Sequence, residues 1–182
     1  MSSTNSEPPT PNCRLRAAIR DIPDFPKPGI GFKDITPVLG NGPLFHEAVR
    51  QMAEVCKKEH IAKIAAVEAR GFIFGAAMAS LLEIGFVPIR KKGKLPFRTR
   101  GTQYSLEYGF AEIESHEDAF LPNERVCIVD DVLATGGTAS AAVRLVLESG
   151  ADVVLLQCFI ELSALNGRAA LAPLPVSSLL QF

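Results

Sequence analysis

Several features that mark familiar protein classes are absent from this chain of 182 residues. Its four cysteines lie far apart and form no Cys-x-x-Cys pair, so neither a zinc site nor a disulfide framework is indicated, and a reducing cytoplasm is expected. No apolar run is long enough to span a bilayer, so no membrane partner is expected. The formal net charge is −1, which does not favour nucleic acid as a partner.

The common nucleotide-binding motifs are missing as well. No Gly-x-x-x-x-Gly-Lys occurs, and Gly29-Ile30-Gly31 is not completed by a third glycine because Asp34 stands in its place. The first twelve residues are rich in Ser, Thr and Pro and have no apolar core, so they are expected to form a disordered tail rather than a secretory signal. Residues 13–182 are long enough for one domain with a full core.

What the chain does contain is an alternation of apolar strand-like runs and helical periodicity. Strands are expected near residues 63–68, 86–90, 125–130, 152–160 and 176–180. Such alternation predicts an α/β fold: a single domain with a doubly wound, mostly parallel, five-stranded sheet and helices on both faces. Ligands of such sheets bind at the carboxyl ends of the strands.

The most informative stretch is 125–150. Val126–Val129 is a short apolar run typical of a buried strand, and two carboxylates, Asp130 and Asp131, end it. A turn of small residues, Ala134–Thr138, follows, and an Ala-rich helical segment then runs to Gly150.

This order of residues suits a sugar phosphate. A helix start offers unpaired backbone N–H groups and a positive dipole end, which attract phosphate, and Gly136 and Gly137 let the backbone approach an anion closely. Thr135 and Thr138 add hydroxyl donors. The two aspartates would repel a phosphate, but they suit sugar hydroxyls or a divalent metal. A tight turn with a solvated acidic pair fits the spacing alone equally well.

The segment Val-Cys-Ile-Val-Asp-Asp-Val-Leu-Ala-Thr-Gly-Gly-Thr also resembles the phosphoribosyl-pyrophosphate signature of type I phosphoribosyltransferases. The resemblance implies that fold, with an N-terminal hood over about 22–38 and a flexible β-hairpin lid over about 94–110. It implies that one set of residues binds the phosphate and ribose of the donor or of AMP: Asp130, Asp131, Ala134, Thr135, Gly136, Gly137 and Thr138.

Two further segments resemble the diphosphate site of the same family. Arg70, in Glu-Ala-Arg-Gly-Phe, could be an ordinary surface arginine, but in the family this loop binds diphosphate, often with a cis peptide that would fall at Glu68–Ala69. The basic stretch from Arg90 to Arg100 could be a solvated loop or a nucleic-acid patch, but it matches the family's Arg-Lys-x-Gly-Lys-Leu-Pro. The implied diphosphate-binding residues are Glu68, Ala69, Arg70, Arg90, Lys91 and Lys94.

The hood and the lid resemble those of adenine phosphoribosyltransferases. Pro-Asp-Phe-Pro-x-Pro-Gly and Phe-Lys-Asp-Ile-Thr-Pro match the hood, although Gly31 and Lys33 replace residues that are often β-branched and Arg in the family, so backbone contacts are expected there more than side-chain contacts. The catalytic residues implied are Glu107, which would handle the base proton, and Arg70. The implied adenine-binding residues are Ile30, Gly31, Phe32, Lys33, Tyr108, Val132 and Leu162.

The resemblance thus implies transfer of a phosphoribosyl group to adenine, giving AMP and diphosphate. Mg²⁺ is the implied cofactor, bound mainly through the donor, with Asp130 and Asp131 as candidate protein ligands. A homodimer is also implied. Two alternatives remain open at this point: a phosphoribosyltransferase for hypoxanthine, guanine, xanthine or orotate, and a non-catalytic regulator that senses the same donor.

Overall fold

The computed structural model describes residues 12–105 and 110–182. Backbone contacts divide the chain into two compact units, residues 1–48 and 49–182. Helix α3 (Gly42–Lys58) runs across the boundary. Among the described residues, no helix is both long and apolar enough to cross a bilayer.

The first unit is built from four short elements: α1 (Cys13–Ala18), β1 (Arg20–Ile22), β2 (Phe32–Asp34) and α2 (Thr36–Leu39). Strands β1 and β2 pair antiparallel. Gly29, with φ +83°, turns the connection between them and donates its N–H to Asp24 Oδ1 at 2.7 Å. Asp34 accepts hydrogen bonds from Arg20 Nε and from the backbone N–H of Thr36, each at 2.9 Å, and so ties β2 to β1 and to α2. The assignment of residues 22–38 as a hood remains a prediction.

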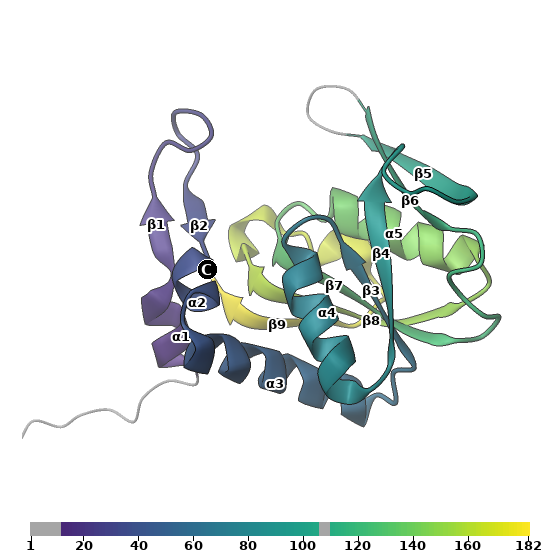
Figure 1. The fold of residues 1–182 in the computed structure, drawn as a ribbon. Helices are drawn as coiled ribbons and strands as arrows, with labels where there is room; N and C mark the ends of the chain where they lie inside the picture. The colour runs from purple at the N-terminus through teal and green to yellow at the C-terminus, as the bar shows by residue number, and fades with distance from the viewer. Residues whose placement is uncertain (1–11, 106–109) are drawn as a thin grey trace, which may run out of the picture. The chain divides into compact units, whose positions relative to one another are not determined.

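The second unit contains a seven-stranded sheet, in the order β5-β6-β4-β3-β7-β8-β9 (Figure 1). Its strands are β3 (Lys63–Val67), β4 (Gly85–Lys91), β5 (Thr99–Ser105), β6 (Phe110–His116), β7 (Arg125–Leu133), β8 (Asp152–Glu161) and β9 (Val176–Gln181). The neighbours from β4 to β9 are parallel, and these five strands confirm the predicted parallel sheet.

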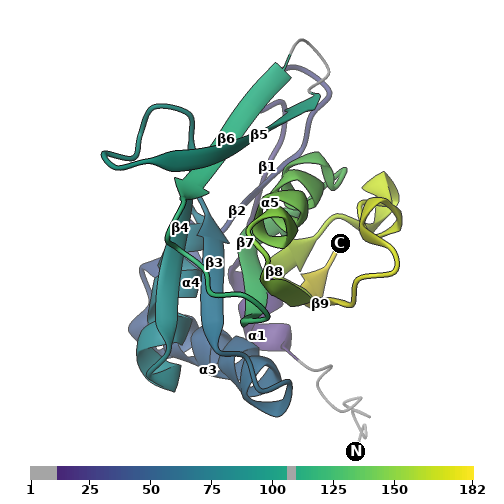
Figure 2. The same ribbon diagram turned by 90° about the vertical axis from the view of Figure 1, so that its right-hand side faces the viewer.

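Helices α4 (Gly71–Leu82) and α5 (Gly137–Glu148) cover opposite faces of the sheet (Figure 2). Successive residues of a strand point to opposite faces of the sheet, so alternate residues of β3 pack toward α4 and toward α5. A Cβ on Gly75 of α4 would lie 2.5 Å from the Cβ of Ala66, so the backbone of α4 lies directly on β3. Ala65 belongs instead to the core cluster that includes Leu145 of α5.

The hairpin formed by β5 and β6 extends the sheet, which the sequence did not show. The resemblance implied a β-hairpin lid over about 94–110, and the structure adds that β6 pairs antiparallel with both β5 and β4. Arg144 of α5 also holds β5, since its guanidinium donates to Thr102 Oγ1 at 2.9 Å and to the carbonyl of Gln103 at 2.5 Å. Residues 106–109 lie outside the described part of the chain, and the lid assignment of 94–110 remains a prediction.

Candidate active site

The carboxyl ends of β3 and β7 meet in a cavity of about 470 Å³. Most of the predicted donor-binding residues lie along it. Those that line it are Glu68, Ala69, Arg70, Lys91, Asp130, Asp131, Ala134 and Thr138. A second cavity, of about 80 Å³, is formed by the turn from Ala134 to Thr138 together with Asp130 and its neighbours. The structure therefore brings together the acid pair, the Gly-rich turn and Arg70.

A larger cavity of about 770 Å³ lies elsewhere, between α5 and residues 170–175. Its lining is mostly apolar, and it contains none of the residues that the sequence singled out. The chemical groups that a phosphorylated sugar requires are in the smaller cavities, so we assign the active site there.

The turn before α5 is shaped as an anion site. Gly136 has φ +87° and forms the N-cap of α5, which begins at Gly137. A left-handed residue at this position is accessible to glycine at little cost. The first N–H groups of a helix have no partner within the helix, and they lie at the positive end of its dipole, so the turn can accept a phosphate.

The acid pair lies beside Arg70, with Asp131 buried and Asp130 partly buried. Asp131 is 5% exposed, and its Oδ2 lies 2.7 Å from Arg70 Nε. Asp130 Oδ1 accepts a hydrogen bond from the backbone N–H of Asp131 at 2.8 Å. Burial raises the pKa of Asp130 well above its ordinary value, and the neighbouring charge of Asp131 adds to the rise. Burial also raises the pKa of Asp131, against the opposing effect of Arg70.

These carboxylates still have acceptor capacity for a ligand. The ion pair with Arg70 does not have the alignment of a hydrogen bond, so Asp131 Oδ2 is buried without a hydrogen-bond donor. Such an oxygen suits a sugar hydroxyl or a divalent cation. The described residues contain no cluster of three or more potential metal ligands. The site therefore fits Mg²⁺ only as a cation that takes most of its ligands from substrate and water.

The loop at Glu68–Arg70, which is predicted to bind diphosphate, has the expected backbone geometry. The Glu68–Ala69 peptide is cis, as the resemblance implied. Glu68 Oε2 accepts hydrogen bonds from Arg90 Nε at 3.0 Å and from the backbone N–H of Lys91 at 3.1 Å. Arg90 Nη1 also donates to the carbonyl of Lys94 at 2.9 Å. The structure thus joins the two segments predicted to bind diphosphate, and Arg90 is the residue that links Glu68 to Lys94.

The predicted base-binding residues belong to both compact units of the chain and to the segment outside the described residues. Val132 lines the cavity, and Leu162 follows β8, where its N–H donates to the carbonyl of Leu133 at 2.9 Å. The predicted hood residues Ile30, Gly31, Phe32 and Lys33 belong to the first unit, and the ammonium group of Lys33 pairs there with Asp21. Glu107 and Tyr108 lie outside the described residues.

Two residues that support the site were missed in the sequence. Glu114 is 4% exposed, and its Oε1 accepts the backbone N–H groups of Gly93, Lys94 and Leu95 at 2.9–3.2 Å, so it fixes the basic turn. A Cβ on Gly71 would lie 3.0 Å from the carbonyl oxygen of Val129, so α4 begins against the end of β7. The sequence offered a signal only for Gly71, which stands inside the Glu-Ala-Arg-Gly-Phe match.

Comparison with known proteins agrees with this geometry. The phosphoribosyl transferase domain family matches residues 38–169. The adenine phosphoribosyltransferase of Mesorhizobium japonicum is 54% identical over 92% of this chain and 94% of its own. The enzyme of that name from Sulfurimonas denitrificans is 55% identical over 88% of this chain and 89% of its own.

Solved structures lead to the same family. The adenine phosphoribosyltransferase of Thermoanaerobacter pseudethanolicus superposes with a TM-score of 0.90 at 47% identity, covering 93% of this chain and 98% of that one. The enzyme from Saccharomyces cerevisiae, solved with adenine and an iminoalditol bisphosphate, has a TM-score of 0.88 at 36% identity, covering 91% of this chain and 96% of that one. With a family match over most of its length and relatives about half identical to it, the chain belongs to the adenine phosphoribosyltransferases, enzymes of purine salvage.

Proposed function

We propose roles for individual residues in the family's reaction, in which adenine and 5-phospho-α-D-ribose 1-diphosphate (PRPP) give AMP and diphosphate. The observation that carries the proposal is the cavity in which Asp130, Asp131 and Arg70 lie beside the Ala134–Thr138 turn. An acid pair next to an anion-binding turn matches a ribose that bears a phosphate at one end.

The donor is held at three places. The turn from Ala134 to Thr138 holds the 5′-phosphate through backbone N–H groups and the threonine hydroxyls. Asp130 and Asp131 accept hydrogen bonds from the ribose hydroxyls, which favour the ionised carboxylates and so oppose the effect of burial on their pKa values. Together these anchors fix C1′ against the attacking nitrogen of the base.

Charge builds up on the diphosphate as it departs. Arg70 lies at the cavity and neutralises that charge, while Glu68 and Arg90 hold the loop that also presents Lys91 and Lys94. Asp130 and Asp131 are the candidate protein ligands for Mg²⁺, which would be held mainly by oxygens of the donor and would supply further neutralisation of the leaving group. This role fits a site whose two carboxylates alone make an incomplete ligand set.

The family resemblance assigns base binding to Val132 and Leu162 of the second unit, and to backbone atoms of Ile30 to Lys33 in the first unit. Glu107 exchanges the proton of the adenine ring, and Tyr108 lines the site; both roles come from the family resemblance.

Replacing Glu107 with Ala is expected to lower kcat about 100-fold or more while leaving the KM for PRPP within a few-fold, because a proton-transfer group acts on the chemical step. Steady-state kinetics at saturating donor measures this, and an unchanged kcat would remove Glu107 from the mechanism.

The whole assignment is tested by a panel of bases with a single donor. Adenine, hypoxanthine, guanine, xanthine and orotate are each incubated with PRPP, with Mg²⁺ and after its chelation, and diphosphate release is measured. Release with adenine in the presence of Mg²⁺ is expected to exceed that with every other base. Failure to release diphosphate with any base would support a non-catalytic regulator.

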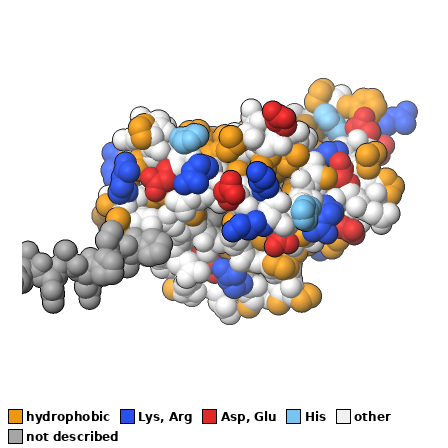
Figure 3. Space-filling model, turned by 90° about the horizontal axis from the view of Figure 1, so that it is seen from below, with side chains coloured by type: hydrophobic (Ala, Val, Ile, Leu, Met, Phe, Trp, Pro, Cys, Tyr) orange, Lys and Arg blue, Asp and Glu red, His pale blue; other side chains and the backbone are white. Residues whose placement is uncertain are grey.

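A homodimer and a cytoplasmic location complete the proposal. The outer face of α4 exposes Ile73 (39%) and Leu81 (49%), which would suit an apolar contact with a second copy. The four cysteines are free thiols, three of them buried, which fits a reducing compartment. On the face seen in Figure 3, basic and acidic side chains are intermixed rather than gathered by sign.

Light scattering tests the dimer. It should give twice the chain mass of 19.6 kDa, and a measured mass of 19.6 kDa would show a monomer and refute the dimer.

A further inference from the structure

We infer that Gly167 and Arg168 are positioning residues for the 5′-phosphate turn, although they stand some thirty residues beyond it in the chain. Both belong to residues 163–171, which we call the floor segment and which include the short 3₁₀ helices η1 (Ser163–Leu165) and η2 (Ala169–Leu171). The inference deepens the proposed function, since it takes the Ala134–Thr138 turn to be the phosphate site.

The floor segment packs directly against the phosphate turn. A Cβ on Gly167 would lie 2.1 Å from the carbonyl oxygen of Ala134, a distance that no side chain can occupy. In the other direction, a Cβ on Gly136 would lie 2.6 Å from the carbonyl oxygen of Gly167 and 3.0 Å from the Cβ of Ala170. Two glycines thus allow two backbones to meet without side chains between them, and the floor segment limits how far the turn can move.

A hydrogen bond ties the first turn of α5 to the same segment. Ser140 Oγ donates to the carbonyl of Ala170 at 3.1 Å. The phosphate turn is therefore held on two sides, by close contact at Gly167 and by this hydrogen bond at the start of the helix. The N–H groups that bind the phosphate belong to the backbone between these two points.

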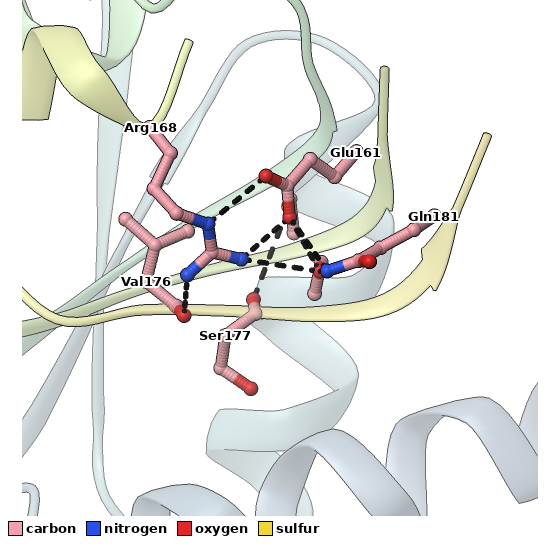
Figure 4. Close-up of polar contacts among 7 residues, drawn as sticks. Glu161, Arg168, Val176, Ser177 and Gln181 are labelled. Atoms are coloured by element: carbon pink, nitrogen blue, oxygen red, sulfur yellow. Dashed lines mark hydrogen bonds and ion pairs between the residues drawn. The ribbon is translucent and has the colours of Figure 1, made fainter. Parts of the chain in front are cut away.

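Arg168 anchors the floor segment to the sheet. Its Nε donates to Glu161 Oε1 at 3.0 Å and its Nη2 to Glu161 Oε2 at 2.5 Å, while Nη1 donates to the carbonyl of Val176 at 2.5 Å. Figure 4 shows the guanidinium between the end of β8, which carries Glu161, and β9, which carries Val176. A planar guanidinium that meets a carboxylate with two hydrogen bonds fixes orientation as well as distance.

The carboxylate of this pair is itself held firmly. Glu161 is 6% exposed, and its Oε2 also accepts hydrogen bonds from Ser178 Oγ at 2.6 Å and from Gln181 Nε2 at 3.3 Å. The hydrogen bond from Arg168 is the main cause that lowers the pKa of Glu161, so the carboxylate is ionised at neutral pH. The ion pair of Arg168 with Glu161 is thus hydrogen-bonded to both β8 and β9. Gly167, the residue before Arg168, contacts the phosphate turn.

The chain of contacts predicts which substrate should be affected. A methyl group at position 167 pushes the Ala134 carbonyl and with it the amides that bind phosphate, and loss of the Arg168 fork releases the floor segment from the sheet. Each variant should weaken binding of PRPP and AMP, which carry the 5′-phosphate, and leave binding of adenine, which carries none. A merely structural role would lower stability without separating the two substrates.

The test compares Gly167→Ala and Arg168→Met with a matched glycine control, Gly42→Ala, where nothing lies within 4 Å of the added Cβ. In steady-state assays the KM for PRPP should rise about tenfold to 100-fold in the first two variants, as expected when hydrogen bonds to a charged group are misaligned. The KM for adenine should stay within about twofold, since adenine has no phosphate to contact the turn. Gly42→Ala should match the parent enzyme, since Gly42 does not contact the phosphate turn.

Thr138→Ala separates failure of this inference from failure of the proposed function. If Thr138→Ala raises the KM for PRPP and the two floor variants do not, the floor segment has no positioning role. If Thr138→Ala has no effect either, the turn is not the phosphate site and the proposed function fails. If Gly167→Ala and Arg168→Met do not fold, Ser140→Ala provides the test, since it removes only the hydroxyl that donates to the carbonyl of Ala170. A KM for PRPP in Ser140→Ala equal to the parent's would then overturn the inference.

Discussion

Replacing Asp130 and Asp131 together with Asn is expected to lower kcat/KM for PRPP by about 10²–10⁴, because each carboxylate hydrogen bond to a sugar hydroxyl contributes about 1.5–3 kcal/mol when one partner is charged. Both side chains line the cavity beside the phosphate turn. The amide is close in size to the carboxylate but carries no charge, so the change acts on hydrogen bonding and on metal affinity more than on shape. Initial rates over a range of donor concentrations, with Mg²⁺ held constant, measure the effect.

Folding should survive this double change. Burial raises the pKa of both aspartates, which means that the folded state disfavours their charged forms. For an acid whose folded pKa is raised, stability is greatest below the unfolded pKa and falls as pH rises through that value toward the folded pKa. At neutral pH the charged pair therefore contributes no stability of its own, and thermal unfolding of the double variant should occur no lower than in the parent.

Asp152→Asn provides the matched control. Asp152 is exposed at the start of β8, at the opposite end of that strand from Glu161. Its replacement should leave both the kinetics and the melting temperature unchanged. Retention of the parent's kcat/KM by the Asp130 and Asp131 double variant would show that the acid pair does not hold the donor.

Replacing Arg70 with Gln is expected to lower kcat about 10²–10³-fold, the effect of removing one preorganised donor to a developing negative charge. Arg70 Nε lies 2.7 Å from Asp131 Oδ2 in a cavity that also contains the diphosphate loop. The substitution removes the positive charge at the leaving group and also the partner of a buried carboxylate. Single-turnover measurement of AMP formation isolates the chemical step, which should slow, while the KM for adenine should change little.

Arg50→Gln is the corresponding control, because Arg50 is an exposed arginine on α3. Its loss should leave turnover as it is. A kcat for Arg70→Gln within a few-fold of the parent's would mean that other groups neutralise the diphosphate. Arg90 is the first alternative to examine, although its guanidinium already contacts Glu68 and the carbonyl of Lys94.

The structure changes how the basic residues are understood. In the sequence, Arg90 and Lys94 were expected to contact diphosphate directly. In the fold, Arg90 contacts Glu68 and the carbonyl of Lys94, and Glu114 accepts three N–H groups of the same turn. Arg90 therefore has an organising role in the described structure, whatever it does when the donor is bound.

Local pattern alone indicated much of the site. The five parallel strands were predicted because buried strands are short apolar runs with polar residues at their ends. The Gly-rich turn was predicted because glycine at positive φ before a helix start is a local property, and Gly136 has this conformation. The family resemblance added the cis peptide at Glu68–Ala69, which spacing alone did not indicate.

The sequence by itself determined the type of sheet, the Gly-rich turn before α5 and the position of the acid pair, because each depends on residues next to one another in the chain. Only the tertiary structure decided what holds these groups in place: Glu114 under the basic turn, β6 between β5 and β4, and Gly167 against Ala134. The contacts of Glu114, of β6 with β4 and of Gly167 join residues about 20 to 33 positions apart, and no periodicity or spacing indicates them. They form because folding brings distant backbones within van der Waals and hydrogen-bond distance. At that distance the absence of a Cβ at Gly167 allows the close contact, and the buried carboxylate of Glu114 supplies the acceptor for three N–H groups.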